Sequence, residues 1–141
     1  MGTRSHILYE KENEEVVQMY CHYDGYLEHN GQMLMKHYNN EDKAKALVNN
    51  GYASGLKPTL EEINKGRVHE EKAVTSRSLN SYMLGVDPGF IEFIYLWNCK
   101  EGKWWVATSE VMDLDSAYNR YVAYHTKFTP LTEMLKELDA A

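Results

Sequence analysis

The clearest strand of this chain is Phe90-Ile91-Glu92-Phe93-Ile94-Tyr95-Leu96-Trp97. Its aromatic and β-branched side chains fit the pleated, half-buried surface of a sheet. A polar turn over residues 98–102 follows, and residues 103–108 have the composition of a returning strand. Two strands joined by so short a turn predict a β-hairpin.

A second hairpin is predicted near the N-terminus. Ser5 to Glu10 forms one strand pattern, residues 11–14 are a charged turn, and residues 15–21 return with an apolar body. Because both strand pairs are hairpins, we expect a mainly antiparallel sheet.

Helical patterns occupy other parts of the chain. Apolar residues recur at helical spacing over 27–38 and 44–48, and Thr59 with Glu62 has the spacing of a capping box. Thr129-Pro130 predicts the start of a final helix with one apolar face. Residues 67–78 are polar and aperiodic and are interpreted as a long loop, and residues 113–120 as one or two helical turns.

These elements predict an α+β fold in which an antiparallel sheet built from two hairpins carries helices packed on one face. With 141 residues and no linker pattern, the chain is expected to form a single domain over residues 1–141.

Charge and cysteine content exclude several classes of function. The net charge is −6, and the 15 basic residues are spread thinly, so duplex nucleic acid is not an expected partner. No apolar run reaches the length of a membrane span. Cys21 and Cys99 form neither a CxxC pair nor a zinc spacing. With no signal-peptide pattern, the cytoplasm is the expected compartment.

Aromatic residues are the unusual part of the composition, with 11 Tyr, three Trp and three Phe. Neighbours on a strand point to opposite faces, so one ring of Trp104-Trp105 is expected in the core and the other outside, where it could stack a ligand or contact a subunit. The alternative is that both rings are covered. The surplus of aromatic residues predicts a homodimer or a higher closed oligomer, with the late hairpin at or near the contact.

Groups that bind and catalyse are concentrated between the second strand and the first helix. The segment is Tyr20-Cys21-His22-Tyr23-Asp24-Gly25-Tyr26-Leu27-Glu28-His29-Asn30-Gly31. Loops of this kind present functional groups on a rigid scaffold. The candidate ligand-binding residues are Arg4, His22, Tyr23, Asp24, Tyr26, His29 and Trp104. Gly31 lies inside the predicted helix, which indicates the close approach of a neighbouring element or a ligand.

Three readings of this segment stay open. His22, Asp24 and His29 could bind a metal or act in acid–base chemistry, or His22 and Asp24 could hydrogen-bond to the loop backbone. Arg4 could pair with Asp24 or hold a phosphate. No nucleophile accompanies the histidines, because Cys21 and its strand neighbour His22 point to opposite faces. The residues therefore favour binding over catalysis, with no metal and no cofactor expected.

Several segments match a known family. They are Thr3-Arg4-Ser5, the stretch from Tyr20 to Tyr26, then Glu28, Gly31, Leu34 and Tyr38, the helix Lys45-Ala46-Leu47-Val48 leading to Gly51, Ser54 and Leu56, and the late hairpin from Tyr95 to Trp104. In these the chain resembles a family of small phage and prophage proteins. The family usually has Trp at the position of Tyr23 and Pro at the position of Leu27.

The resemblance implies a phage accessory protein that acts in the cytoplasm of an infected bacterium. Many small phage proteins counter host defence, and some are oligomeric sponges for cyclic nucleotide or cyclic ADP-ribose signals. The expected function is therefore sequestration of a small phosphorylated or nucleotide-like immune signal without catalysis. A small metal-dependent nucleotide hydrolase and an inhibitor that binds a host defence protein directly are the alternatives.

Overall fold

The computed structural model describes residues 3–68, 70–87, 90–113, 120–124 and 128–140. The strands are β1 (Ser5–Glu10), β2 (Val16–Cys21), β3 (Tyr52–Ala53), β4 (Val74–Ser76), β5 (Phe93–Asn98), β6 (Lys103–Asp113), β7 (Arg120–Tyr124) and β8 (Thr129–Pro130). The helices are α1 (Gln32–His37), preceded by the π-helical turn η1 (Leu27–Gly31), α2 (Glu41–Asn49), α3 (Leu60–Asn64), α4 (Leu79–Gly85) and α5 (Leu131–Ala140).

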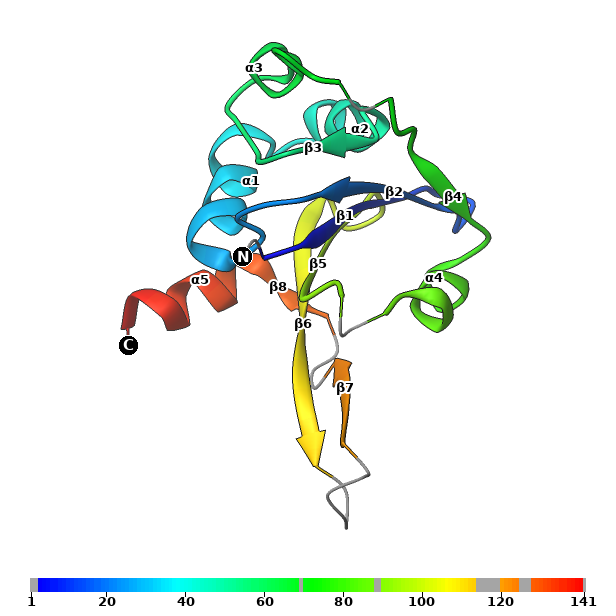
Figure 1. Ribbon diagram of the computed structural model, residues 1–141, viewed down its shortest axis with the longest axis vertical. Helices are drawn as coiled ribbons and strands as arrows, with labels where there is room; N and C mark the ends of the chain where they lie inside the picture. The colour runs from blue at the N-terminus through cyan, green and yellow to red at the C-terminus, as the bar shows by residue number, and fades with distance from the viewer. Residues whose placement is uncertain (1–2, 69, 88–89, 114–119, 125–127, 141) are drawn as a thin grey trace.

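The fold is α+β, and its strands form a mixed sheet with the order β3-β2-β1-β5-β6-β7 (Figure 1). The two predicted hairpins are confirmed, because β1 pairs with β2 and β5 pairs with β6, both antiparallel. The prediction of an antiparallel sheet is wrong at two places: β5 runs parallel to β1, and β3 runs parallel to β2. Hairpin patterns specify only local pairings, whereas both parallel pairings join strands separated by helices.

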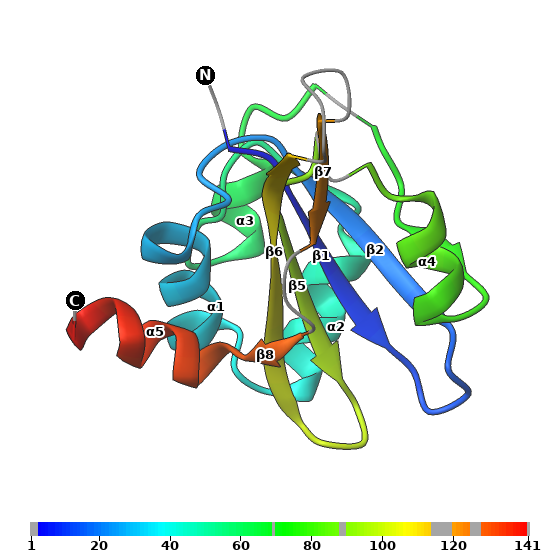
Figure 2. The same cartoon turned by 90° about the horizontal axis from the view of Figure 1, so that it is seen from below.

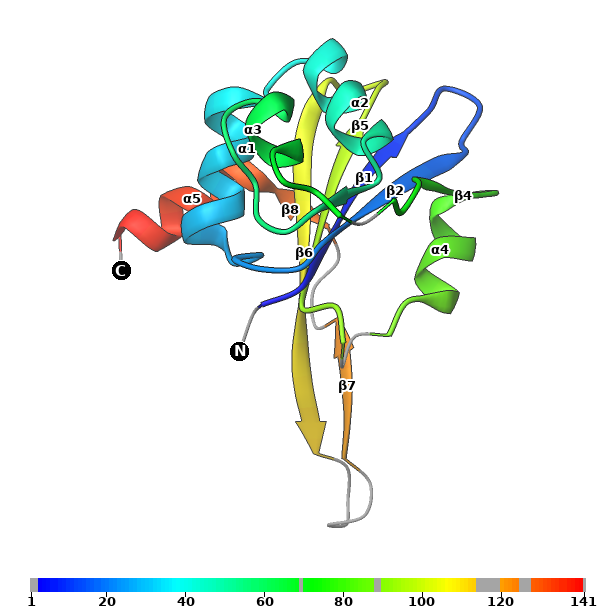
Figure 3. The same ribbon diagram turned by 45° about the horizontal axis from the view of Figure 1, so that its top comes forward.

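Side chains alternate between the two faces of the sheet and form two cores. Ile7, Tyr95 and Trp104 belong to a core that also includes buried residues of α1, α2, α3 and α5. Leu8 and Ile94 belong to a second core on the opposite face, which α4 covers with Tyr82 and other residues (Figure 3). The prediction that helices pack on one face is therefore wrong for α4, because the patterns of β1 and β5 are apolar on both faces.

Local signals placed several helix boundaries correctly. The Thr59 hydroxyl accepts a hydrogen bond from the Glu62 amide at 3.2 Å and donates to the Glu62 carboxylate at 3.1 Å, which confirms Thr59 as the N-cap of α3. Gly51, after α2, has a φ of +81°, the left-handed conformation that favours glycine.

The predicted loop over residues 67–78 is partly wrong. It contains β4, which pairs with β2, and the unpredicted helix α4 follows it. The predicted helical turns over 113–120 begin and end in strands, at Asp113 of β6 and Arg120 of β7, and the residues between lie outside the described part of the chain.

Helix α5 lies beside α1 and η1 on the first face (Figure 2). A Cβ on Gly31 would lie 3.3 Å from Leu135 Cδ2 and 3.4 Å from Leu131 Cδ1. The element that approaches Gly31 is therefore α5. Among the described residues, no helix combines the length and the apolar character that spanning a bilayer requires.

Candidate functional site

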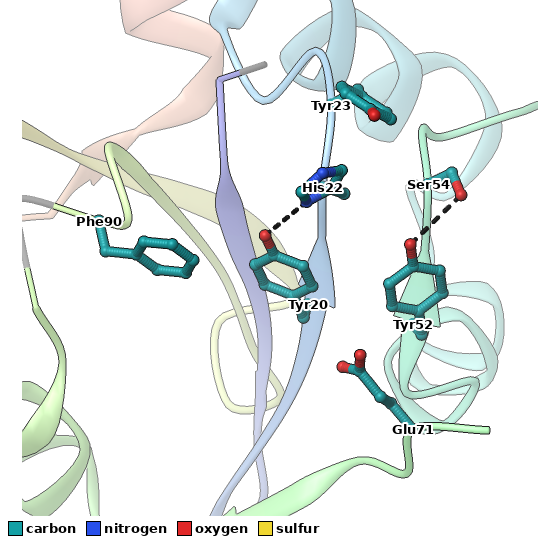
Figure 4. Close-up of a pocket in the computed structure, with 7 residues that line it drawn as sticks. All are labelled: Tyr20, His22, Tyr23, Tyr52, Ser54, Glu71 and Phe90. Carbon is teal, nitrogen blue, oxygen red and sulfur yellow. Dashed lines mark hydrogen bonds between the residues drawn. The ribbon is translucent and has the colours of Figure 1, made fainter. Parts of the chain in front are cut away.

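An open pocket lies on the α4 face of the sheet, beside the second core (Figure 4). Its volume is about 540 Å³. It is lined by Tyr20, His22, Tyr23, Tyr52, Ser54, Glu71 and Phe90, and we call it the aromatic pocket. Tyr20 of β2 and Tyr52 of β3 are partners in the parallel pairing of these strands, which places both rings on one face.

Tyr20 is the centre of a set of rings. Its ring centroid lies 6.2 Å from that of Phe90 with an interplanar angle of 8°, and 6.1 Å from that of Tyr52. The Tyr20 hydroxyl and the His22 Nδ1 share a hydrogen bond of 2.7 Å. The His22 and Tyr23 rings meet edge-on, with their centroids 4.4 Å apart. Tyr23 and Phe90 are 48% and 46% exposed, so the pocket presents ring surface to solvent.

Arg4 adds a positive charge at one end of this set of rings. Its guanidinium carbon lies 4.4 Å from the centroid of the Phe90 ring, which is a cation–π contact. Its Nε is buried and has no hydrogen-bond partner among the described residues. Burial raises the pKa of the Tyr20 hydroxyl, and the nearby Arg4 opposes that increase.

Backbone hydrogen bonds hold the loop after β2 in place. The amides of His22 and Tyr23 donate to Ala53 and Ser54 at 3.0 and 2.7 Å, so the end of β2 is joined to β3 and the residue that follows it. The Gly25 amide donates to the Thr3 carbonyl at 2.8 Å. These contacts give the His22 and Tyr23 side chains a rigid support.

Of the candidate residues, His22 and Tyr23 line the pocket and Arg4 contacts Phe90 beside it, whereas the other candidates lie elsewhere. Asp24 accepts a hydrogen bond from the Tyr26 hydroxyl at 3.2 Å, and neither lines the pocket. Asp24 also has a φ of +60°, which fits a turn role for Asp24-Gly25. No ion pair between Arg4 and Asp24 is present in the described part of the chain.

His29 and Trp104 lie away from the pocket. The His29 Nε2 lies 3.1 Å from the Leu56 carbonyl oxygen, so this side chain hydrogen-bonds to the loop before α3. Trp104 is 1% exposed, and its indole N–H donates to the Tyr38 carbonyl at 3.0 Å. The prediction that Trp104 binds the ligand is therefore wrong, because its position on the strand points its ring into the core under α1. The half-buried Trp105 packs against the second core.

Five lining residues are absent from the predicted set: Tyr20, Tyr52, Ser54, Glu71 and Phe90. Tyr20 belongs to the segment from Tyr20 to Gly31, and Phe90 belongs to the predicted strand, but β5 begins only at Phe93. Tyr52 and Glu71 carried no local signal, because the parallel pairing of β3 and the path of the chain before β4 bring them to the pocket.

The geometry bears on the metal and nucleophile readings. Within the described ranges, no group of three or more His, Cys, Asp or Glu side chains could hold a metal ion. The Cys21 thiol is buried on the face opposite the pocket and contacts the Tyr23 carbonyl at 3.3 Å. Burial raises the pKa of this thiol, which disfavours the reactive thiolate.

Comparison of the chain with protein-family models, with curated proteins and with solved structures gives no match.

Proposed function

We propose that this chain is a binding protein that holds a small nucleotide-like ligand in the aromatic pocket without turning it over. The observation that carries the proposal is the set of rings around Tyr20, open to solvent, with the Arg4 guanidinium over one of them.

The chemistry of the pocket suits a base. Stacking of a nucleobase on an aromatic side chain contributes about 1–3 kcal/mol, and Tyr23 and Phe90 are about half exposed. The Glu71 carboxylate can accept N–H groups from the edge of a base. A volume of about 540 Å³ is also within the range of small-molecule sites.

The polar groups of the pocket favour binding over turnover. The His22 Nδ1 and the Tyr20 hydroxyl bond to each other at 2.7 Å, and the nearest cysteine, Cys21, points to the opposite face. In the setting that the phage resemblance implies, the ligand is a nucleotide-derived immune signal, and the protein acts by sequestering it.

A thermal-shift screen tests the proposal. The compounds are cyclic dinucleotides, cyclic trinucleotides, cyclic ADP-ribose isomers and NAD, and at least one is expected to raise the melting temperature. Chromatography of the mixture after incubation is expected to return that compound intact. No shift with any compound would reject the proposal, and conversion of the ligand to product would favour an enzyme.

Two tyrosines of the same loop provide a matched pair of variants. Tyr23→Ala removes an exposed ring that lines the pocket, and Tyr26→Ala removes an exposed ring that does not. We expect Tyr23→Ala to weaken binding about ten-fold, since one stacked ring is lost, and Tyr26→Ala to change it less than about two-fold. Equal effects of the two variants would place the ligand outside the aromatic pocket.

A further inference from the structure

A second pocket adjoins the aromatic pocket and has a different chemistry. It has a volume of about 240 Å³ and shares Tyr52 and Ser54 with the aromatic pocket. Its other charged lining residues are Lys57, Lys65, Arg67 and Glu62, and we call it the basic pocket.

The cations of the basic pocket are arranged around α3. Lys57 precedes this helix and Lys65 follows it, both are exposed, and neither ammonium group has a hydrogen-bond or ion-pair partner in the described part of the chain. Arg67 is held in place, because its guanidinium donates to the Asn50 and Glu71 carbonyls at 3.0 and 2.8 Å. Its carbon Cζ lies 5.6 Å from the centroid of the Tyr52 ring, between the two pockets.

The basic pocket keeps a net positive charge, because three cationic side chains and one carboxylate line it. The one carboxylate that lines the basic pocket, that of Glu62, accepts a hydrogen bond from the Thr59 hydroxyl at 3.1 Å in the cap of α3. The aromatic pocket has the opposite balance, since Glu71 is the charged residue that lines it. A phosphate is therefore repelled from the Glu71 carboxylate and attracted to the three cations.

We propose that the ligand is a nucleotide that spans both pockets, with its base on the rings around Tyr20 and its phosphate between Lys57 and Lys65. The sugar then crosses the wall formed by Tyr52 and Ser54. This inference rests on the proposed function and assigns the phosphate to the basic pocket and not to Arg4, which lies beside Phe90 at the other end of the rings.

Isothermal titration calorimetry with adenosine, guanosine, AMP and GMP tests the inference. Wild-type protein is expected to bind one of the nucleotides at least about ten-fold more tightly than its nucleoside, since charge-assisted contacts to phosphate are among the strong ones. In the double variant Lys57→Gln/Lys65→Gln, this advantage is expected to fall below about three-fold while the affinity for the nucleoside is unchanged.

The matched control is Lys36→Gln/Lys45→Gln, which removes the same charge from exposed positions on α1 and α2. It is expected to keep the ten-fold advantage. The inference is overturned if the control loses as much as the Lys57/Lys65 variant, if nucleoside and nucleotide bind equally, or if Arg4→Gln removes the advantage instead.

The failure of this inference is distinguishable from the failure of the proposed function. If none of the four compounds binds while a compound of the thermal-shift screen does, the mononucleotide arrangement is wrong and the proposed function stands. If no compound of either set binds, both are wrong.

Discussion

Gly25 lies where the loop after β2 crosses the start of β1. A Cβ at this position would lie 2.8 Å from both the Ser5 Cβ and the Thr3 carbonyl oxygen. The Gly25 carbonyl accepts a buried hydrogen bond of 2.6 Å from the Tyr95 hydroxyl, so the backbone cannot easily move away. The loop that carries His22 and Tyr23 is therefore attached to the centre of the sheet through Gly25.

Replacement of Gly25 by Ala is expected to lower the free energy of unfolding by about 1–3 kcal/mol, because the added methyl group overpacks against backbone. Urea denaturation measures the change. The matched control is Gly85→Ala, where a Cβ meets nothing within 4 Å. There the change is expected to be neutral or stabilising by up to about 1 kcal/mol, as Ala favours the helix. Equal changes in the free energy of unfolding of the two variants would contradict the close contact proposed for Gly25.

His6 makes stability depend on pH. Its Nδ1 and the Tyr82 hydroxyl share a hydrogen bond, and burial lowers the pKa of the imidazole from 6.5 to about 4. Between these two values the unfolded chain binds the proton and the folded chain does not. The stability that the neutral His6 imidazole provides is therefore fully present above pH 6.5. As the pH falls towards 4, the free energy of unfolding decreases by up to about 3 kcal/mol.

The comparison variant for this prediction is His6→Gln, whose free energy of unfolding is expected to fall less steeply between pH 6.5 and 4 than that of the wild type. Denaturation by urea at pH 4.5, 5.5 and 7 provides the slopes. His37→Gln, which removes a histidine from the end of α1 and leaves the His6–Tyr82 contact in place, is expected to keep the steeper slope. Parallel profiles for wild type and His6→Gln would refute the assignment.

At the scale of elements, the two faces of the sheet differ in what covers them. The first face is covered by α1, α2, α3 and α5 around the larger core. On the second face, the core under α4 occupies one part, and the aromatic pocket lies beside it. Changes to α5, which lines neither pocket, should therefore alter stability without altering ligand binding.

Helix α5 provides the test of this separation. Leu131 is fully buried against η1, so Leu131→Ala is expected to lower the free energy of unfolding by about 2–5 kcal/mol through lost contacts and a cavity. Leu84→Ala on α4, where the side chain is 90% exposed, is the control and should change stability by less than about 0.5 kcal/mol.

Binding of the ligand is the second measurement on the Leu131→Ala variant. Below its melting temperature the variant is expected to bind with wild-type affinity, because α5 and the pocket lie on opposite faces. A loss of affinity in the folded variant would show that the two faces are coupled.

At the scale of the whole molecule, the end of β6 over residues 109–113 pairs with β7 to form an arm that extends away from the body (Figures 1 and 3). In the described part of the chain, β7 is the last strand in the sheet order. An edge strand can pair with another chain. Trp104 is buried and Trp105 is half-buried, so the arm, and not these rings, offers the surface for self-association.

We expect a homodimer or a higher closed oligomer in which the β6–β7 arm takes part. Light scattering between about 1 and 100 µM is expected to give a mass of at least twice 16.4 kDa. A mass of 16.4 kDa at every concentration would refute this expectation and would leave each chain with a complete site of its own.

The amino-acid sequence by itself determined the elements that depend on neighbouring residues. The apolar run within Ser5–Glu10 and the cap at Thr59 are both local, since strand preference and capping hydrogen bonds act within a few residues. The same locality explains why His22 and Tyr23, which are neighbours in the chain, could be named together as candidates.

Only the tertiary structure decided which segments meet. The parallel pairings of β1 with β5 and of β2 with β3 join strands that are distant in the chain, and no local pattern specifies such partners. The pairing of β3 with β2 brings Tyr52 to the pocket, and the path of the chain before β4 brings Glu71 there. Contacts of this kind arise from the burial of whole faces, which depends on every element at once.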